Sequence, residues 1–202
     1  MKIGILPSIK ENYKNQFEYS IDIRFRKLFE KCFRKKVEII LIDDQSKLNN
    51  VDLIVFSGGN DLIKYSKLRE NKIRHDKFLK ILKKAIKLKK NIFSICFGSL
   101  FLANYFGSKI VRTSNHKKKH KIFINIRNKK RHYLVNSYHN FKIIDLDKKF
   151  QIIANAFDGS IESFYLAEKK IFCVMWHPER YQKIQKLDIE LMTRYIYLDK
   201  TK

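Results

Sequence analysis

One short segment, residues 91–102 (NIFSICFGSLFL), constrains the fold of this chain more than any other. An apolar, β-favouring run leads into Cys96, and a helix-like run follows at residues 100–105. Gly98 leaves room for a crowded turn between the two runs. A strand, a sharp turn and a helix in this order would place the Cys96 thiol at the positive end of a helix, which favours the thiolate. Cys96 is therefore a candidate nucleophile, and the alternative is a buried cysteine of a core strand.

Apolar strands alternate with amphipathic helices in the first half of the chain. We expect strands at residues 2–6, 37–42, 51–56 and 91–95, and helices at 18–34, at 77–89 and from the Cys96 turn to about Phe106, where Gly107 stops the last helix. This alternation predicts an α/β fold with a mainly parallel central sheet flanked by helices. Ligands bind such sheets at the carboxyl ends of the strands. The loop at residues 57–59 and Cys96 both follow predicted strands, so we expect them to face one crevice.

The second half of the sequence predicts an antiparallel β extension. Short strands are expected at 122–126, 131–135, 142–146, 151–156, 161–166 and 171–176, with turns at 128–130 and 158–160 and a final helix at 182–198. Neither a linker nor an internal repeat divides the sequence. We therefore expect residues 1–202 to form one domain with a full core.

Composition limits the partners that we expect. The formal charge of +24 would suit nucleic acid or an anionic small molecule. The lysines are spread along the whole chain, however, so nucleic acid is the less favoured partner. No apolar stretch approaches the roughly 18 residues of a membrane span, and residues 1–7 resemble a core strand and not a signal peptide. The three cysteines form no CxxC pair. We expect a cytoplasmic protein without a membrane segment, a cofactor or a metal site.

A second polar group stands at the end of another apolar run. His177 and Glu179 follow residues 171–176, and their spacing of two places them on the same side of an extended chain. A carboxylate beside an imidazole fixes its tautomer and supports the imidazolium, and a cysteine nucleophile needs such a base. The pair could complete a Cys-His-acid site, although a solvated polar turn is the alternative for His177 by itself.

Four motifs together resemble the class I glutamine amidotransferase family. They are SGGND (57–61), ICFG (95–98), VNSYHN (135–140) and VMWHPE (174–179), in the family's order and spacing over about residues 1–180. The likeness is greatest to the gamma-glutamyl hydrolase branch, which includes enzymes that cleave gamma-glutamyl-aminobutyrate. The resemblance implies a flavodoxin-like fold, a Cys-His-Glu triad and a glutamyl-thioester intermediate.

The resemblance also implies a role for each matched residue. Cys96 would attack the gamma-carbonyl of a glutamyl amide, His177 would shuttle the proton and Glu179 would orient His177. The backbone N–H groups of Gly59 and Phe97 would form the oxyanion hole. The implied substrate-binding residues are Gly58, Asn60, Ser137, Tyr138, His139, Glu162 and His120. For His120, part of a solvated basic loop is the alternative.

Leu100 departs from the family pattern, because a glutamine usually stands four residues after the nucleophile. Leucine cannot make the hydrogen bonds of that glutamine, so we expect a gamma-glutamyl amide other than glutamine as the substrate, cleaved to glutamate and an amine or amidate. A nucleotide- or phosphate-linked amide, such as the gamma-glutamyl intermediate of capsule phosphoramidate biosynthesis, would suit Arg112, Lys117 and Lys121 as contacts, although a solvated face is the alternative for each.

Two other functions stay open at this point. One is a glutaminase subunit that supplies ammonia to a separate synthetase partner, which Leu100 disfavours. The other is a non-catalytic nucleic-acid-binding or regulatory protein, which the intact set of Cys96, His177 and Glu179 disfavours.

Overall fold

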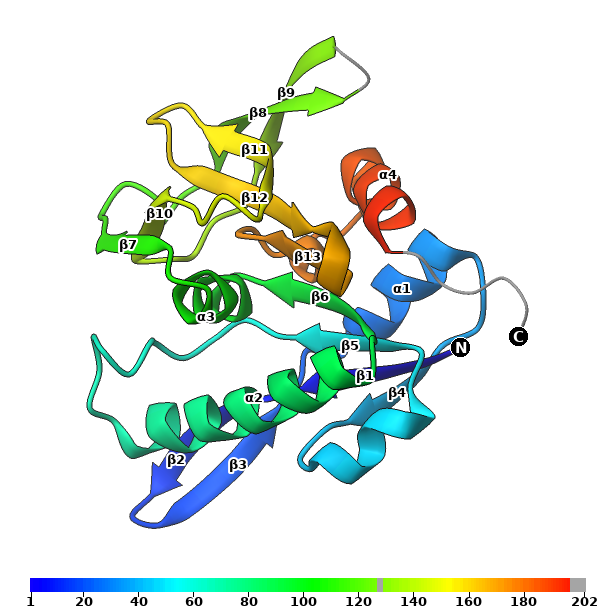
Figure 1. Cartoon of the computed structure of the whole chain (residues 1–202), viewed down its shortest axis with the longest axis vertical. Helices are drawn as coiled ribbons and strands as arrows, with labels where there is room; N and C mark the ends of the chain where they lie inside the picture. The colour runs from blue at the N-terminus through cyan, green and yellow to red at the C-terminus, as the bar shows by residue number, and fades with distance from the viewer. Residues whose placement is uncertain (127–128, 197–202) are drawn as a thin grey trace.

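A mixed sheet of eleven strands forms the centre of the computed structural model, which describes residues 1–126 and 129–196 (Figure 1). Five strands are parallel to one another, in the order β4 (Glu38–Leu41), β1 (Lys2–Leu6), β5 (Leu53–Phe56), β6 (Asn91–Ile95) and β13 (Ile171–Val174). The antiparallel part continues with β12 (Ile161–Leu166), β11 (Gln151–Ala156), β8 (His120–Ile126) and β9 (Lys129–Val135). The strands β10 (Phe141–Asp145) and β7 (Lys109–Arg112) branch from β12. The predicted α/β architecture with an antiparallel extension is confirmed.

Helices cover both faces of the parallel part (Figure 1). On one face, α1 (Phe25–Phe33) packs against α4 (Lys186–Tyr195), and Phe29 and Leu191 share a core with the strands. On the other face, α2 (Arg69–Lys87) and α3 (Phe97–Tyr105) bury Phe78 and Phe101 in a second core. Each such side chain contributes roughly 1.5–3 kcal/mol of burial free energy. The short 3-10 helices are η1 (Gln45–Asn50), η2 (Ala167–Lys169) and η3 (Pro178–Arg180).

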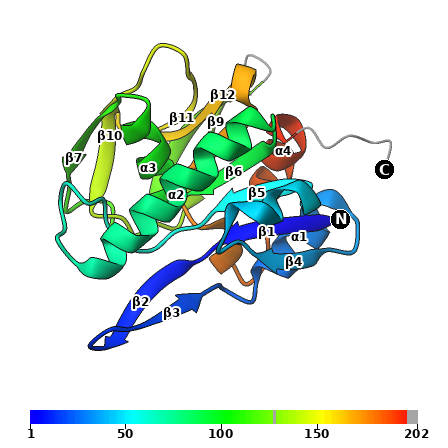
Figure 2. The same cartoon turned by 60° about the horizontal axis from the view of Figure 1, so that its bottom comes forward.

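Two helix predictions need correction. The expected helix at 18–34 begins only at Phe25, because residues 16–20 form β3 (Gln16–Ser20), which pairs with β2 (Ser8–Tyr13) in a hairpin (Figure 2). This hairpin satisfies its backbone by strand pairing and packs β2 along α2. The helix expected at 77–89 begins earlier, at Arg69. Its first turns bury the polar residues Asn71 and Arg74, so they lack the apolar periodicity that marks a helix.

The second half confirms the expected strands and adds β7, which was not predicted. The last strand, β13, differs from the expected antiparallel meander: it pairs antiparallel with β12 but parallel with β6, with Val174 opposite Ile95. The carboxyl end of β13 therefore lies beside that of β6. The final helix is shorter than expected and ends at Tyr195, while residues 197 and 198 of that prediction, and residue 128 of the predicted turn, lie outside the described residues.

Within residues 1–126 and 129–196, no helix is both long enough and apolar enough to cross a membrane.

Candidate active site

Cys96 occupies a strained turn between β6 and α3. Its backbone dihedrals, φ 50° and ψ −107°, are ones that non-glycine residues rarely adopt, and such a conformation costs on the order of 1–3 kcal/mol. Its N–H donates to the Val174 carbonyl at 2.9 Å, which ties the turn to β13. Gly98 is required sterically, since a Cβ there would lie 2.3 Å from the Phe56 carbonyl oxygen. The turn therefore holds the thiol at the first turn of α3, as the sequence predicted.

His177 lies just beyond the end of β13 and joins Cys96 to a carboxylate. Its Nδ1 lies 2.6 Å from Glu179 Oε1, its ring interacts with the Cys96 sulfur, and all three residues are buried. Burial disfavours the imidazolium, but the Cys96 sulfur and the Glu179 carboxylate outweigh it and raise the pKa of His177 to about 9. The imidazole can therefore carry a proton at neutral pH.

Asn136 fixes the backbone of His177. Its side-chain Nδ2 donates to the His177 carbonyl and its Oδ1 accepts from the His177 N–H, both at 2.8 Å. The Asn136 N–H in turn donates to the Tyr181 hydroxyl at 2.9 Å. Asn136 was not among the predicted site residues, although it belongs to the VNSYHN motif.

A pocket of about 280 Å³ opens at Cys96 and His177. Its walls come from four parts of the chain: Gly59, Asn60 and Asp61; Cys96, Phe97 and Leu100; Tyr138, His139, Asn140 and Phe141; and His177 with Arg180. The crevice shared by the glycine loop and the cysteine turn is thus confirmed. Leu100 lines it with an apolar side chain, and the ring of Tyr138 meets that of His177 edge-on at 5.4 Å.

Arg74 holds the glycine loop from behind. The guanidinium is fully buried, stacks at 4.4 Å on Phe97 and donates to the carbonyl oxygens of Ser57 (2.8 Å), Gly58 (2.9 Å) and Gly59. Within the described residues it forms no ion pair with an acidic side chain, and burial lowers its pKa to about 9. In a trans peptide the C=O and N–H point in opposite directions, so a Gly58 carbonyl turned toward Arg74 turns the Gly59 N–H away from it.

Two loop residues have close packing constraints of their own. A Cβ on Gly58 would lie 2.4 Å from Cε1 of His177, so only glycine lets the imidazole approach. The Asn60 amide, expected at the substrate, is occupied by the protein: Oδ1 accepts from the Ile9 N–H and Arg74, and Nδ2 donates to the Ile9 carbonyl and Asn71. The side-chain amide of Asn60 therefore joins the hairpin to the loop, while the residue itself lines the Cys96 pocket, so a substrate contact of Asn60 stays a prediction.

Four predicted substrate residues lie outside the lining of the Cys96 pocket, and one of them is Gly58, which packs against His177. Ser137 is buried, and its Oγ donates to the His116 carbonyl. Glu162 is completely buried on β12, and His120 lies at the start of β8 with its ring beside that carboxylate. Only His139 both lines the pocket and faces Glu162, at 3.6 Å. The pocket lining therefore gives no support to a direct substrate contact by Glu162, Ser137 or His120, which stays a prediction.

The Glu162 carboxylate is surrounded by imidazoles. His116, a residue that the sequence analysis missed, places Nδ1 3.1 Å from Glu162 Oε1 and Nε2 3.2 Å from Asp158 Oδ2. Burial would raise the pKa of Glu162, but the surrounding histidines hold it well below its usual range. Burial likewise opposes protonation of His116, yet the two carboxylates raise its pKa. This group is a histidine–glutamate cluster behind the pocket wall.

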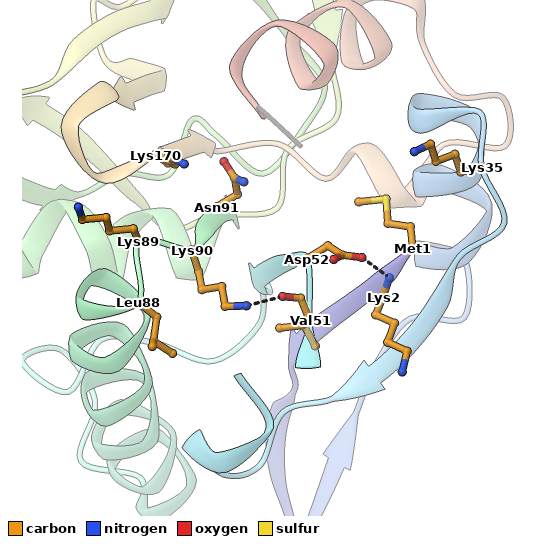
Figure 3. A pocket seen from close by; sticks show the side chains of 10 residues that line it. All are labelled: Met1, Lys2, Lys35, Val51, Asp52, Leu88, Lys89, Lys90, Asn91 and Lys170. Carbon is orange, nitrogen blue, oxygen red and sulfur yellow. Dashed lines mark hydrogen bonds between the residues drawn. The ribbon is translucent and has the colours of Figure 1, made fainter. Parts of the chain in front are cut away.

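Two further cavities differ in their relation to Cys96. A basic pocket of about 480 Å³ contains Arg112 and Lys117 and shares Asp61, Asn140 and Phe141 with the Cys96 pocket. A larger pocket of about 520 Å³ lies at the amino ends of the strands, lined by Met1, Lys2, Lys35, Val51, Asp52, Leu88–Asn91 and Lys170 (Figure 3). Its volume does not make it the candidate site, because it lies far from the cysteine turn and from the carboxyl ends of the parallel strands.

Sequence patterns could have found some of the missed residues but not others. Asn136 lies inside the VNSYHN motif, so the motif itself could have indicated that this residue belongs to the site. Arg74 was hidden in a helix whose start was placed too late, and a buried arginine resembles a surface residue in sequence. His116 carries no local signal, because the partners Glu162 and Asp158 are more than forty residues away.

Comparison with known proteins places the chain in a family. Residues 9–190 match the family described as "Glutamine amidotransferase class-I", and the protein belongs to this family. Among curated relatives, the chain is 32% identical over 139 residues to the gamma-glutamyl-CDP-amidate hydrolase of Campylobacter jejuni subsp. jejuni serotype O:2, an alignment covering 69% of this chain and 68% of the relative. It is 30% identical over 174 residues to the glutamine amidotransferase-like protein YvdE of Lactococcus lactis subsp. lactis, covering 71% and 74%.

A solved structure supports the fold independently. A crystal structure described as that of a GMP synthase subunit from Thermoplasma acidophilum superposes with a TM-score of 0.71, covering 96% of this chain and 92% of that one. The sequence identity of 20% limits this likeness to the fold.

Proposed function

We propose that the protein is a cysteine-dependent hydrolase that cleaves a gamma-glutamyl amide. The observation that carries this proposal is the contact between Cys96, held at a strained strand-to-helix turn, and the buried His177–Glu179 pair. A thiol, a base and an orienting carboxylate in this relation form an activated nucleophile. Membership of the class I glutamine amidotransferase family and the hydrolase name of the C. jejuni relative support the same chemistry.

The proposed reaction has two halves. The Cys96 thiolate attacks the gamma-carbonyl carbon, and the C=O electron pair moves onto the oxygen. Protonated His177 then gives its proton to the leaving nitrogen, the C–N bond breaks, and an amine or amidate departs. Water, deprotonated by His177, attacks the glutamyl thioester, the C–S bond breaks, and glutamate leaves with the Cys96 thiolate restored beside protonated His177. Glu179 orients the imidazole through both halves.

The oxyanion would be held by the backbone N–H groups of Gly59 and Phe97. Donors aimed at a developing oxyanion typically lower the barrier by about 3–4 kcal/mol. The Gly59 N–H faces away from Arg74 because the Gly58 carbonyl accepts from that guanidinium. We assign Arg74 the role of a positioning residue for this half of the oxyanion hole.

The amide substrate is proposed to be anionic on its leaving side. Leu100 lines the pocket without a hydrogen-bonding group, which disfavours free glutamine. The neighbouring pocket offers Arg112 and Lys117, and Arg180 lines the Cys96 pocket itself. The name of the C. jejuni relative specifies a nucleotide-linked amide, and the basic pocket suits a substrate of this class. Lys121, the third expected contact, is exposed and is not among the residues that line either pocket.

Glutamate release tests the proposal. Wild-type protein is incubated with glutamine, with small gamma-glutamyl amides and with a gamma-glutamyl amide linked to a cytidine diphosphate. We expect release from the nucleotide-linked substrate, a loss of at least about 10³-fold in Cys96→Ala, and wild-type rates in Cys32→Ala, since Cys32 lies on α1 outside the pocket. Equal release by wild type and Cys96→Ala would refute a cysteine-dependent hydrolase, whereas release from glutamine alone would favour the ammonia-supplying subunit.

A further inference from the structure

Three imidazole nitrogens converge on one carboxylate oxygen in the histidine–glutamate cluster. His116 Nδ1, His120 Nε2 and His139 Nε2 lie 3.1, 3.4 and 3.6 Å from Glu162 Oε1. Ligand atoms of His116, His139 and Glu162 lie within 4.8 Å of one another, and all three residues are buried. Two ligands bound about 2.0–2.1 Å from a tetrahedral zinc ion are separated by roughly 3.4 Å. The side chains are therefore spaced like metal ligands.

The far nitrogen of each ring already has a hydrogen-bond acceptor. His139 Nδ1 lies 2.8 Å from the Phe141 carbonyl, His116 Nε2 lies 3.2 Å from Asp158 Oδ2, and His120 Nδ1 lies 3.4 Å from the Lys118 carbonyl. In a neutral imidazole, a proton on the far nitrogen leaves a lone pair on the near one. Metal-binding histidines in proteins are held by this arrangement of outer hydrogen bonds.

With lone pairs on the near nitrogens, the rings would present acceptors to an acceptor carboxylate, so no hydrogen bond could form between them. In the described part of the chain, His120 Nε2, His139 Nε2 and Glu162 Oε2 are buried atoms without a hydrogen-bond partner. Buried polar groups are normally satisfied, and each exception calls for a ligand, a water or a proton. A cation among these atoms would satisfy the nitrogens and the carboxylate at once.

We propose that His116 Nδ1, His139 Nε2 and the Glu162 carboxylate, with His120 Nε2 as a fourth ligand, bind one divalent transition-metal ion of the zinc type. Imidazole nitrogens with one carboxylate are donors that suit zinc. Four protein ligands make the site closed and structural. It joins three segments that are distant in sequence: the start of β8 and the loop before it, the segment before β10, and β12.

The ion would stabilise the wall of the active-site pocket. His139 lines that pocket, and the adjacent Tyr138 contacts the His177 ring. The proposed metal ligands do not include Cys96, His177 or Glu179 and take no part in the proposed chemistry, so the metal proposal does not depend on the hydrolase proposal. Metal content and affinity test it without an activity assay.

The experiment uses full-length protein without an affinity tag. We expect about one equivalent of zinc per chain by elemental analysis, and tight rebinding of Zn²⁺ by calorimetry after chelation and dialysis. Glu162→Gln keeps the side-chain shape but removes the charged ligand and should lose the bound zinc. Asp158→Asn removes an outer partner of His116 and should weaken zinc affinity about 10–100-fold. His132→Gln, an exposed histidine on β9, is the matched control and should bind like wild type.

Cobalt substitution adds a readout of the ligand geometry. Wild-type protein loaded with Co²⁺ should show the visible absorption bands of a tetrahedral site, and these should be absent in Glu162→Gln. The proposal is overturned if wild type neither retains nor rebinds zinc, in which case the cluster holds protons in place of a metal. Zinc bound equally by wild type, Glu162→Gln and Asp158→Asn, all folded by circular dichroism, would also overturn it.

Discussion

Cys96 has a backbone conformation that only its surroundings can enforce. Its positive φ is unfavourable, and the packing of β6 and α3 on either side, together with the hydrogen bond to Val174, holds the residue in this conformation. Gly58 and Gly98 then remove the side chains that would collide with His177 and with the Phe56 carbonyl. At the scale of the residue, the site thus depends on glycine at these two positions as much as on the reactive side chains.

The proton on His177 sets the expected pH dependence. Its pKa of about 9 reflects the Cys96 sulfur and Glu179, which together outweigh burial. The imidazolium persists below that pKa and is lost above it, so kcat/KM should fall as the pH rises through about 9. Glu179→Gln removes one cause of the raised pKa, and it should move this alkaline limb to lower pH and reduce kcat by about 10²–10⁴-fold. Rate profiles of the two proteins from pH 6 to 10 measure this, and superimposable alkaline limbs would contradict it.

Arg74 should affect turnover more than substrate binding. Its planar fork reaches three successive carbonyls, which a lysine ammonium cannot reproduce. We expect Arg74→Lys to lower kcat about tenfold or more, part of the 10²–10³-fold that one oxyanion donor contributes, with KM changed much less. Arg69→Lys, an exposed arginine on the same helix, is the control. Steady-state kinetics decide, and a change confined to KM would count against a positioning role.

At the scale of the element, β13 decides the geometry of the site. It is the strand at which the parallel and antiparallel parts of the sheet meet, because it pairs parallel with β6 and antiparallel with β12. The parallel register brings its end, and hence His177, beside the Cys96 turn. Helix α4 then returns over this region, and Asp188 Oδ1 accepts a hydrogen bond from Trp176 Nε1 at 2.8 Å.

The buried Asp188 makes stability depend on pH. Burial raises its pKa to about 7, whereas its unfolded value is near 3.8. Between these values the folded state holds a proton that the unfolded state has lost, so this group lowers the free energy of unfolding by about 1.4 kcal/mol per rising pH unit. Asp188→Asn keeps the acceptor for Trp176 and does not titrate. Relative to wild type, the variant should therefore gain stability between pH 5 and pH 7.

Urea unfolding at the two pH values measures this difference. Glu190→Gln, also on α4 but less buried, is the control and should follow wild type at both. A stability difference between Asp188→Asn and wild type that is the same at pH 5 and pH 7 would show that Asp188 does not carry a raised pKa.

At the scale of the whole molecule, the catalytic candidates come from segments that only the sheet brings together. Residues 57–61, 95–98, 135–140 and 174–179 follow or precede different strands, and the pocket at Cys96 receives residues from each of them. The whole chain has a formal charge of +24, but only a few basic side chains line the two pockets at this site: Arg180 in the Cys96 pocket, and Arg112 and Lys117 in the neighbouring one. The total charge thus says less about the substrate than these three positions do.

Much of this site was predictable, because its chemistry is encoded locally. The apolar run before Cys96, the glycines around it and the spacing of His177 and Glu179 indicate a strand end with a reactive group, whatever the rest of the chain does. The strands and most helices follow from apolar periodicity for the same reason. The hairpin at residues 8–20 and the early start of α2 did not, because the hairpin strands are largely polar and exposed and the first turns of α2 bury Asn71 and Arg74, so neither segment shows apolar periodicity.

The sequence by itself determined the α/β class, the position of the cysteine turn and the His-Glu pair, because local patterns of apolar, small and polar residues indicate each of them. The tertiary structure alone decided that β13 lies parallel to β6, that Arg74 holds the glycine loop and that three histidines surround Glu162. These features depend on contacts between residues that are 15 to 79 positions apart. Their energy comes from burial and from the pairing of polar groups, which no local pattern records.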